Sequence, residues 1–337
     1  MTVMRLISNS RSGIKDMTPS ELKAAIKGSE GRVVMSQLNT HASVLSDATN
    51  PELAQAMGAD MIMVNGYNMD PAHPDPNANN AITAIDGWTV QEYQGKEKGW
   101  VNKQVRLKEI KEMMDIPMGI YLETSNPEAK RNQEVTTYGW GDIPDGRKAI
   151  KENFAKLKDE GADFVVLAGN PGSGVTYENI IQATKECKEV VGDSVLIFAG
   201  KWEDGNTEPI LGDPQLGMEK SKEIIKQLID AGADCITLAM PGARFGISTD
   251  EIRDLVTFIH TYKPGTLALS FLDGSIEGSD VDTVRLCAIE SKKTGADIHA
   301  IGDAGLNGMS VPEDIYQMAI TIKGRRLTWK RMAGSHR

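Results

Sequence analysis

The stretch GADMIMVN, residues 58–65, has three partial copies further along the chain. Residues 161–170 read GADFVVLAGN, residues 232–240 read GADCITLAM, and residues 295–303 read GADIHAIGD. In each copy a glycine ends an amphipathic stretch, and an apolar run suited to a buried strand follows it. A repeat of this kind indicates a fold assembled from similar helix-to-strand units.

The four copies begin every second member of a series of eight apolar runs. Amphipathic stretches with helical spacing separate these runs from residue 33 almost to the end of the chain. Strict alternation of this kind is typical of a parallel sheet covered by helices, and eight units predict a (β/α)8 TIM barrel. A doubly wound open sheet is the alternative. The expected strands span residues 33–39, 61–65, 117–123, 164–170, 195–201, 235–240, 266–271 and 298–303.

We expect one α/β domain with three parts. An N-terminal segment and helix, residues 1–32, would cover the bottom of the barrel; residues 33–324 would form the barrel, and residues 325–337 a basic C-terminal tail. Capping signals mark four of the helix starts. They are Thr18 with Glu21, Asn50 before Pro51, Ser248 with Glu251, and Ser310 with Glu313.

Composition restricts the classes of partner. The 337 residues include 37 Lys and Arg against 47 Asp and Glu, a formal net charge of -10 at pH 7. This balance lacks the basic footprint of a protein that binds nucleic acid or an anionic membrane. No segment approaches the ~20 apolar residues of a membrane span, and the N-terminus has no signal-peptide core. We therefore expect a cytoplasmic homo-oligomer whose partner is a small anionic substrate.

Three connections after expected strands are too long for plain turns. They span residues 66–100, 124–146 and 202–217, and they carry most of the tryptophans. Barrel enzymes build their active sites on this face, so we expect these segments to form lids or walls of a pocket. Contacts between subunits are the alternative explanation for their aromatic residues.

Seven of the eight expected strands carry a polar residue at or near their C-terminal end, and we take one on each as pointing into the barrel. Alternation then leaves an apolar interior beneath a polar ring. An active site on this scaffold needs such a ring, whereas a purely structural barrel has little reason to desolvate these groups. We assign Gln37, Asn65, Asn170 and Ser270 to substrate binding and the other three members of the ring, Glu123, Lys201 and Asp303, to catalysis.

The charged members of the ring allow several roles. Lys201 is a Schiff-base nucleophile, a clamp on a carboxylate or phosphate, or the ion-pair partner of Glu123 or Asp303. Glu123 and Asp303 suit general acid–base work or joint binding of Mg2+, which is the candidate cofactor. His41, just beyond the first strand, is a fourth catalytic candidate because histidine transfers protons near neutral pH. No nucleotide cofactor is indicated, because the P-loop-like segment at 169–176 has valine in place of the required lysine.

The loops after the last two strands are rich in glycine. Residues 273–280 read DGSIEGSD and residues 302–310 read GDAGLNGMS. In TIM barrels these two loops commonly bind phosphate through backbone N–H groups. The phosphate-binding candidates are Gly274, Ser275, Gly305, Asn307 and Gly308.

Several segments resemble a group of bacterial barrel proteins of poorly defined activity, labelled phosphoenolpyruvate phosphonomutase-like or sometimes haloacid dehalogenase-like. The resemblance rests on MTPSELKAAIKGSEGR, NPELAQAMGADMIMVNGYN, FAGK, GADIHAIGDAGLNGM and PEDIYQMAITIKGRR. It covers nearly the whole chain and implies a barrel acting on a small phosphorylated or carboxylated compound. The K-K-C-G-H signature and the paired-aspartate Mg2+ motif of the characterised mutases and isocitrate lyases are not found in this sequence.

These observations predict an enzyme with its active site at the C-terminal ends of the barrel strands. We expect a lyase or aldolase, or an isomerase or mutase, acting on a small phosphorylated or carboxylated metabolite. A metal-dependent hydrolase of a phosphorylated metabolite and a metabolite-binding barrel without turnover are the alternatives.

Overall fold

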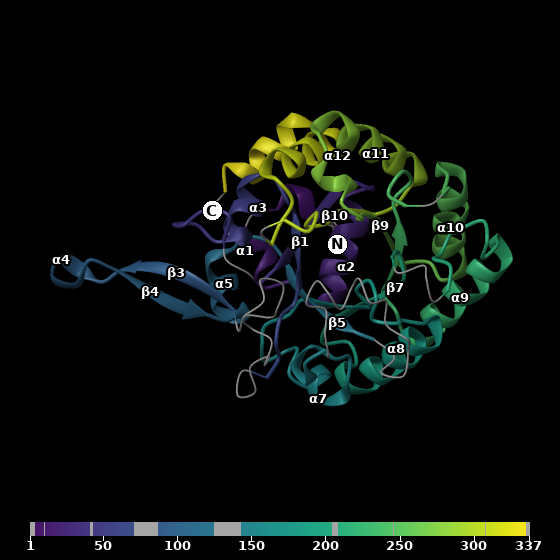
Figure 1. Ribbon diagram of the computed structural model, residues 1–337, viewed down its shortest axis with the longest axis horizontal. Coiled ribbons are helices and arrows are strands. Elements are labelled where there is room, and N and C mark those ends of the chain that lie inside the picture. Colours follow the sequence, from purple (N-terminus) through teal and green to yellow (C-terminus); the bar gives the residue numbers. More distant parts are fainter. Residues whose placement is uncertain are drawn as a thin grey trace.

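The computed structural model describes residues 4–9, 11–40, 43–70, 87–124, 143–203, 208–244, 246–306 and 308–334. Eight parallel strands close into a barrel in the order β1, β10, β9, β8, β7, β6, β5 and β2, with β2 paired to β1 (Figure 1). The predicted (β/α)8 fold is confirmed, and all eight predicted strands are present. The strands are β1 (Val33–Asn39), β2 (Met61–Asn65), β5 (Met118–Glu123), β6 (Phe164–Ala168), β7 (Leu196–Gly200), β8 (Cys235–Ala239), β9 (Leu267–Leu272) and β10 (Ile298–Ile301).

Helices surround the barrel and cover its apolar outer face. The α-helices are α1 (Arg11–Ile14), α2 (Pro19–Gly28), α3 (Asn50–Ala56), α4 (Gly95–Lys98), α5 (Leu107–Met113), α7 (Lys151–Phe154), α8 (Tyr177–Val191), α9 (Met218–Ala231), α10 (Thr249–Tyr262), α11 (Val281–Thr294) and α12 (Pro312–Met332). Short 3-10 turns are η1 (Leu6–Ser8), η2 (Asp145–Arg147) and η3 (Ile276–Gly278). No helix among these described segments is both long and apolar enough to cross a lipid bilayer.

The Gly-Ala-Asp repeat has the same structure in all four copies. Each glycine takes a positive φ, between 84° and 115°, which lets the chain turn sharply from a helix into the next strand. The aspartate that follows donates its backbone N–H to a carbonyl of the neighbouring strand and accepts that residue's N–H on its carboxylate. The pairs are Asp60 with Val34, Asp163 with Met118, Asp234 with Ile197, and Asp297 with Ala268, at 2.7–3.1 Å.

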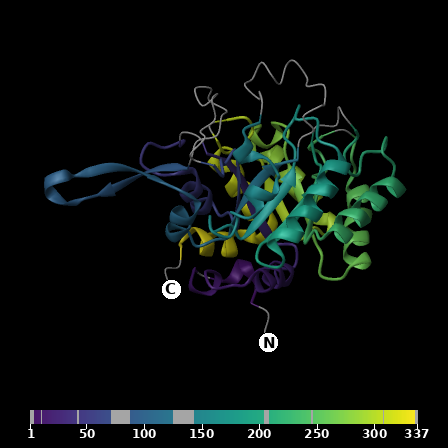
Figure 2. The same cartoon turned by 90° about the horizontal axis from the view of Figure 1, so that it is seen from below.

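Each of these four carboxylates also meets a cation. Lys111 pairs with Asp163 at 2.8 Å, and two lysines of α2, Lys23 and Lys27, reach Asp234 at 2.8 Å and Asp297 at 3.0 Å. Helix α2 therefore lies across the N-terminal ends of the strands, and the purple segment in Figure 2 shows it at that end of the barrel.

The fourth carboxylate is held by the C-terminal helix. Asp60 accepts from Lys323 Nζ at 2.6 Å and from Arg331 Nε at 3.0 Å, and all three side chains are buried. The helix changes direction between these two cations at Gly324, whose φ is 77°. Residues 325–332, which we expected as part of a basic tail, continue as helix and bring Arg331 to the bottom of the barrel.

Two of the four predicted capping signals are confirmed, those at Thr18 and Ser248. The cap of α3 is Thr49 rather than Asn50, because Thr49 Oγ1 accepts the N–H of Glu52 three residues later. Ser310 does not cap α12. Its buried hydroxyl donates to the carbonyl of Glu277 at 2.9 Å, and the helix begins at Pro312.

The long connection after β2 contains a two-stranded antiparallel hairpin, β3 (Trp88–Tyr93) and β4 (Trp100–Val105), which was not predicted from the sequence. We expected a helix over residues 101–115, where Leu107, Ile110 and Met114 recur with the spacing of one helix face. Only residues 107–113 are helical, and residues 100–105 pair with β3 instead. Figures 1 and 2 show the hairpin projecting from the side of the barrel.

Strand register shows which side chains point into the barrel. Residues paired in register on neighbouring strands point to the same side of the sheet. Phe198 of β7 pairs with Val166 of β6, and Val166 pairs with Tyr121 of β5, so these three side chains share one face. The inward residues of β7 and β9 are therefore Phe198 and Phe271, with Trp202 continuing the alternation beyond β7.

Two predicted members of the polar ring thus point outward, Lys201 and Ser270. The assumption that the last polar residue of a strand points inward fails on these two strands, because a shift of one residue exchanges the two faces. On β10, His299 is the register partner of Ser270 and its Nδ1 lies 2.7 Å from Ser291 Oγ on α11, which confirms that this face meets the helices.

We predict that Asp60→Asn destabilises the fold strongly. Neutralising this carboxylate leaves the buried Lys323 and Arg331 cations without a counter-charge, a change that costs about 3–5 kcal/mol when a buried ion pair is broken. Urea denaturation of both proteins measures the loss. The matched control is Asp193→Asn, because the side chain of Asp193 is 98% exposed beside Lys188. Equal midpoints for the two variants would contradict the prediction.

Candidate functional site

The floor of the barrel mouth is aromatic. The Trp202 ring stacks on Phe271 with centroids 4.8 Å apart and meets the edge of Tyr121 at 6.1 Å. The indole Nε1 donates to Asp273 Oδ2 at 3.1 Å. These rings close the interior below the strand ends and leave polar groups above them.

On one side of the mouth, amides surround a carboxylate. Glu123, at the end of β5, accepts the backbone N–H of Asn170 at 2.9 Å and a second hydrogen bond from the Asn170 amide. Asn170 also bonds to Asn65 Nδ2 at 2.8 Å, and Arg147 NH2 lies 3.4 Å from Glu123 Oε1. The structure therefore joins three predicted residues, Asn65, Glu123 and Asn170, in one buried network.

Asp303 lies on another side of the mouth. Gln37 Nε2 donates to its Oδ1 at 3.4 Å, and the amide of Asn39 donates to its Oδ2. Burial, and then the charge of Asp273, raise the pKa of Asp303 to about 6. The carboxyl group thus exchanges its proton within the physiological range.

Three further carboxyl groups crowd this side, Glu203, Asp273 and Glu277, and all are buried. Burial and the neighbouring Asp273 raise the pKa of Glu277 to about 8 and that of Glu203 well above its usual range. Arg244 NH2, at 3.5 Å from Glu203 Oε2, is the nearby cation. A neutral carboxylic acid is therefore the favoured form of Glu203 and Glu277 at neutral pH.

The predicted phosphate loops direct their N–H groups at the protein's own oxygens. Gly274 N–H donates to Asp273 Oδ1 at 2.7 Å, Gly305 N–H to Asp303 Oδ1 at 3.5 Å, and Gly308 N–H to the Leu306 carbonyl at 2.8 Å. Ser275 takes a positive φ of 73° at the start of η3. Asn307, the fifth phosphate-binding candidate, lies outside the described residues.

The remaining catalytic candidates are Lys201 and His41. Lys201 is 1% exposed, and its Nζ donates to the carbonyls of Val175 and Glu208, both at 3.0 Å. Its cation thus ties together the connections that follow β6 and β7. His41 lies outside the described residues.

Several side chains of the site were not predicted from the sequence. Asn39 and Tyr121 lie on strands whose inward-facing residues were predicted, but neither was predicted to belong to the site. Arg147, Glu203 and Arg244 come from connections after strands, where no periodicity reveals where a side chain points. The Tyr121 hydroxyl and Arg244 Nε are buried, and neither has a hydrogen-bond partner within the described part of the chain.

The predicted pair of Mg2+ ligands, Glu123 and Asp303, bonds to separate sets of partners. Among the described residues, no group of three His, Cys, Asp or Glu side chains is arranged to hold a metal ion. Mg2+ binding by these two carboxylates stays a prediction.

The family described as "Domain of unknown function (DUF7916)" matches residues 7–337. No curated protein matches the sequence.

Two solved structures align with most of this chain, and the first of them supports the fold. The carboxyl transferase domain of Rhizobium etli pyruvate carboxylase with 3-hydroxypyruvate aligns with 97% of this chain and 51% of its own, at 12% identity and a TM-score of 0.51. An archaeal fructose 1,6-bisphosphate aldolase aligns with 91% of this chain and 100% of its own, at 11% identity and a TM-score of 0.48. The chain thus spans about half the length of the carboxyl transferase structure. The resemblance to a TIM-barrel family is confirmed; the phosphonomutase-like label stays a prediction.

We predict that Glu277→Gln changes how stability depends on pH. The folded protein holds the Glu277 proton up to about pH 8, whereas the unfolded chain releases it near pH 4.3. Unfolding between these values releases a proton, so this group's contribution falls as pH rises, by about 1.4 kcal/mol for each pH unit. Glutamine cannot titrate, so the variant gains stability relative to wild type from pH 5 to pH 8.

Chemical denaturation at three pH values measures this difference. All other titrating groups are common to both proteins, so the difference reports the titration of Glu277 together with its effect on the adjacent carboxyl groups, Asp273 and Asp303. A constant difference between the two proteins from pH 5 to pH 8 would contradict the assignment.

Proposed function

Since the chain belongs to the DUF7916 family, whose description assigns no activity, we propose a function from the geometry of the mouth. The protein is an enzyme of the lyase or isomerase type that transfers protons on a small carbonyl compound bearing a carboxylate. The observation that carries this proposal is the contrast between two carboxyl environments: Glu123 is held by N–H donors and a guanidinium, whereas Asp303 has a pKa raised to about 6. Opposed environments of this kind indicate acid–base roles.

Asp303 is the proposed proton acceptor. A general base works best when its pKa lies near the operating pH. The amides of Gln37 and Asn39 hold its two oxygens, which fixes the carboxylate in the mouth. Glu123 acts as a positioning residue, because it holds Asn170 and Arg147 at the opposite side.

Arg147 and Arg244 are the proposed anchors for the substrate's carboxylate. A guanidinium binds a carboxylate with paired N–H donors, and the buried Nε of Arg244 has no partner in the described part of the chain. Protonated Glu203 and Glu277 lower the negative charge that an anion would meet. The Tyr121 hydroxyl, buried near Glu123, supplies a further hydrogen-bond donor for a substrate oxygen.

A carboxylate is favoured over a phosphate for this site. The N–H groups of Gly274, Gly305 and Gly308 are already bonded to oxygens of the chain. A phosphate would need to displace those oxygens and lie beside Asp273. The identities of the solved structures are too low to carry a substrate class to this chain.

We predict that the protein catalyses exchange of the C–H proton next to a carbonyl. The purified protein is incubated in D2O with 2-oxo and 3-hydroxy carboxylates and with their phosphorylated counterparts, and 1H NMR follows loss of the C–H signal. Exchange is expected with carboxylates and should rise with pH through about 6, because Asp303 must be deprotonated to accept the proton. Asp303→Asn should lower the rate by roughly 10²–10⁴-fold.

The matched control is Asp282→Asn, whose side chain is 82% exposed on α11; it should keep the wild-type rate. Arg244→Gln should raise the half-saturating concentration about 10- to 100-fold, as expected for a lost hydrogen bond to a charged group. Exchange only with phosphorylated compounds would overturn the carboxylate preference. Ligand-dependent stabilisation without any exchange would favour a binding barrel.

We also predict that Lys201 forms no Schiff base. Its Nζ is directed at Val175 and Glu208 rather than into the mouth. Borohydride is added during turnover of an identified carbonyl substrate, and peptide mass spectrometry then examines Lys201. A reduced adduct there, lost in Lys201→Arg, would restore the nucleophile assignment.

A further inference from the structure

The β3–β4 hairpin has no second layer of its own. Figures 1 and 2 both show it as an arm whose tip, α4, lies far from the barrel. Within the described residues, β3 and β4 form a sheet of two strands and pair only with each other. A two-stranded ribbon alone in water is marginally stable, so an exposed ribbon of this length calls for a partner.

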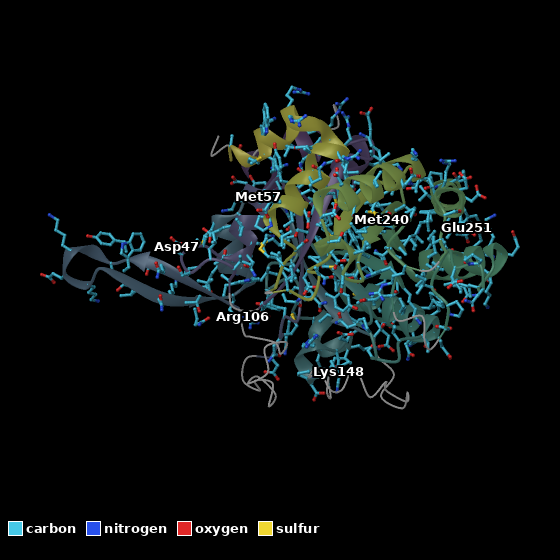
Figure 3. All side chains as sticks on the ribbon, turned by 45° about the horizontal axis from the view of Figure 1, so that its top comes forward. Asp47, Met57, Arg106, Lys148, Met240 and Glu251 are labelled. Atoms are coloured by element: carbon cyan, nitrogen blue, oxygen red, sulfur yellow. The ribbon has the colours of Figure 1, made fainter. Side chains whose placement is uncertain are left out.

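The base of the arm is held firmly against the barrel. Trp88 stacks on Tyr67 with ring centroids 6.2 Å apart, and Val90 and Val105 are buried beside it. Arg106, labelled in Figure 3 where the arm joins the barrel, lies 4.5 Å over the Tyr67 ring and pairs with Glu160 at 2.8 Å. The arm is therefore presented in a defined direction.

One face of the arm carries no charge. Alternation along the two strands places three cross-strand pairs on this face, and all six side chains are exposed. The opposite face carries Glu92 and Lys103. The uncharged face consists of Thr89 with Gln104, Gln91 with Asn102, and Tyr93 with Trp100.

The outer end of this face is aromatic. Tyr93 is 53% exposed and Trp100 is 68% exposed, and their rings lie 5.4 Å apart. Protein interfaces are enriched in tyrosine and tryptophan and depleted of charge at their centres. The face thus has the composition of a contact surface rather than that of a solvated hairpin.

We propose that this face, called the arm face below, binds the arm face of a second copy of the chain across a two-fold axis. Two chains of net charge -10 repel each other, and the arm face is a place where they meet without opposing like charges. The amides of Gln91, Asn102 and Gln104 both donate and accept hydrogen bonds, so the face is complementary to itself. A nucleic-acid partner would require cations that this face lacks.

Sedimentation velocity of the full chain tests the proposal. Wild type is expected to be a dimer or a higher even-numbered oligomer at about 10–100 μM. Trp100→Ser should be monomeric or half the wild-type size at the same concentration, and an unchanged far-UV circular dichroism spectrum shows that the barrel stays folded. The matched control is Trp329→Ser on α12, 54% exposed, which should keep the wild-type size.

Charge substitutions test whether the face binds to itself. Asn102→Asp and Asn102→Lys should each lose association, because a two-fold axis brings two like charges onto the same small interface. An equimolar mixture should recover it, since one negative and one positive copy then meet. A monomeric wild type, a Trp100→Ser variant that keeps the full wild-type size, or failure of the mixture to reassociate would each overturn the proposal.

Discussion

The bond on which this barrel depends is the one made by the aspartate of each Gly-Ala-Asp copy. Its backbone N–H and its carboxylate both engage one residue of the preceding neighbour strand, so each of the four copies fixes one strand pair in register. A slip of one residue would reverse the two faces of a strand. The cations that pair with these carboxylates come from α2, α5 and α12, so helix packing and strand register are stabilised by the same four groups.

Closure of the bottom leaves the opposite end of the barrel for chemistry. There the rings of Tyr121, Trp202 and Phe271 fill the interior beneath the strand ends, and burial raises the pKa of carboxyl groups above them. Carboxyl groups without enough cations hold protons, as Glu277 does, whereas Glu123 is stabilised by Arg147 and the amide of Asn170. Burial, followed by the charge of Asp273, is therefore the main reason why the pKa values of Glu203, Glu277 and Asp303 are raised.

The sequence predicted the barrel and part of the site, for reasons that differ from residue to residue. Strand positions follow from local apolar runs, and Asn65, Glu123 and Asn170 meet because their strands keep strict alternation to the end. Lys201 and Ser270 were misplaced, because alternation does not reveal which of two adjacent residues faces the axis. Asp303 faces the mouth although Ile298 and Ala300 are the inward residues of β10, since the chain turns inward beyond the strand. Arg147, Arg244 and the hairpin depend on long-range packing that no local pattern encodes.

In each copy of the internal repeat, the residues that stabilise the barrel come first and the residue at the mouth end comes last. The four copies are identical at their first three residues, which face the bottom, and they diverge at their ends, which reach the mouth: Asn65, Asn170, Met240 and Asp303. Two of these residues bond to each other, one is a buried thioether, and one is a carboxyl group with a raised pKa. A symmetric scaffold thus presents an asymmetric set of groups, and a substrate bound among them would meet the proposed proton acceptor on one side and the amide network on another. These different groups on different sides of the mouth, rather than the barrel fold itself, would orient a bound substrate.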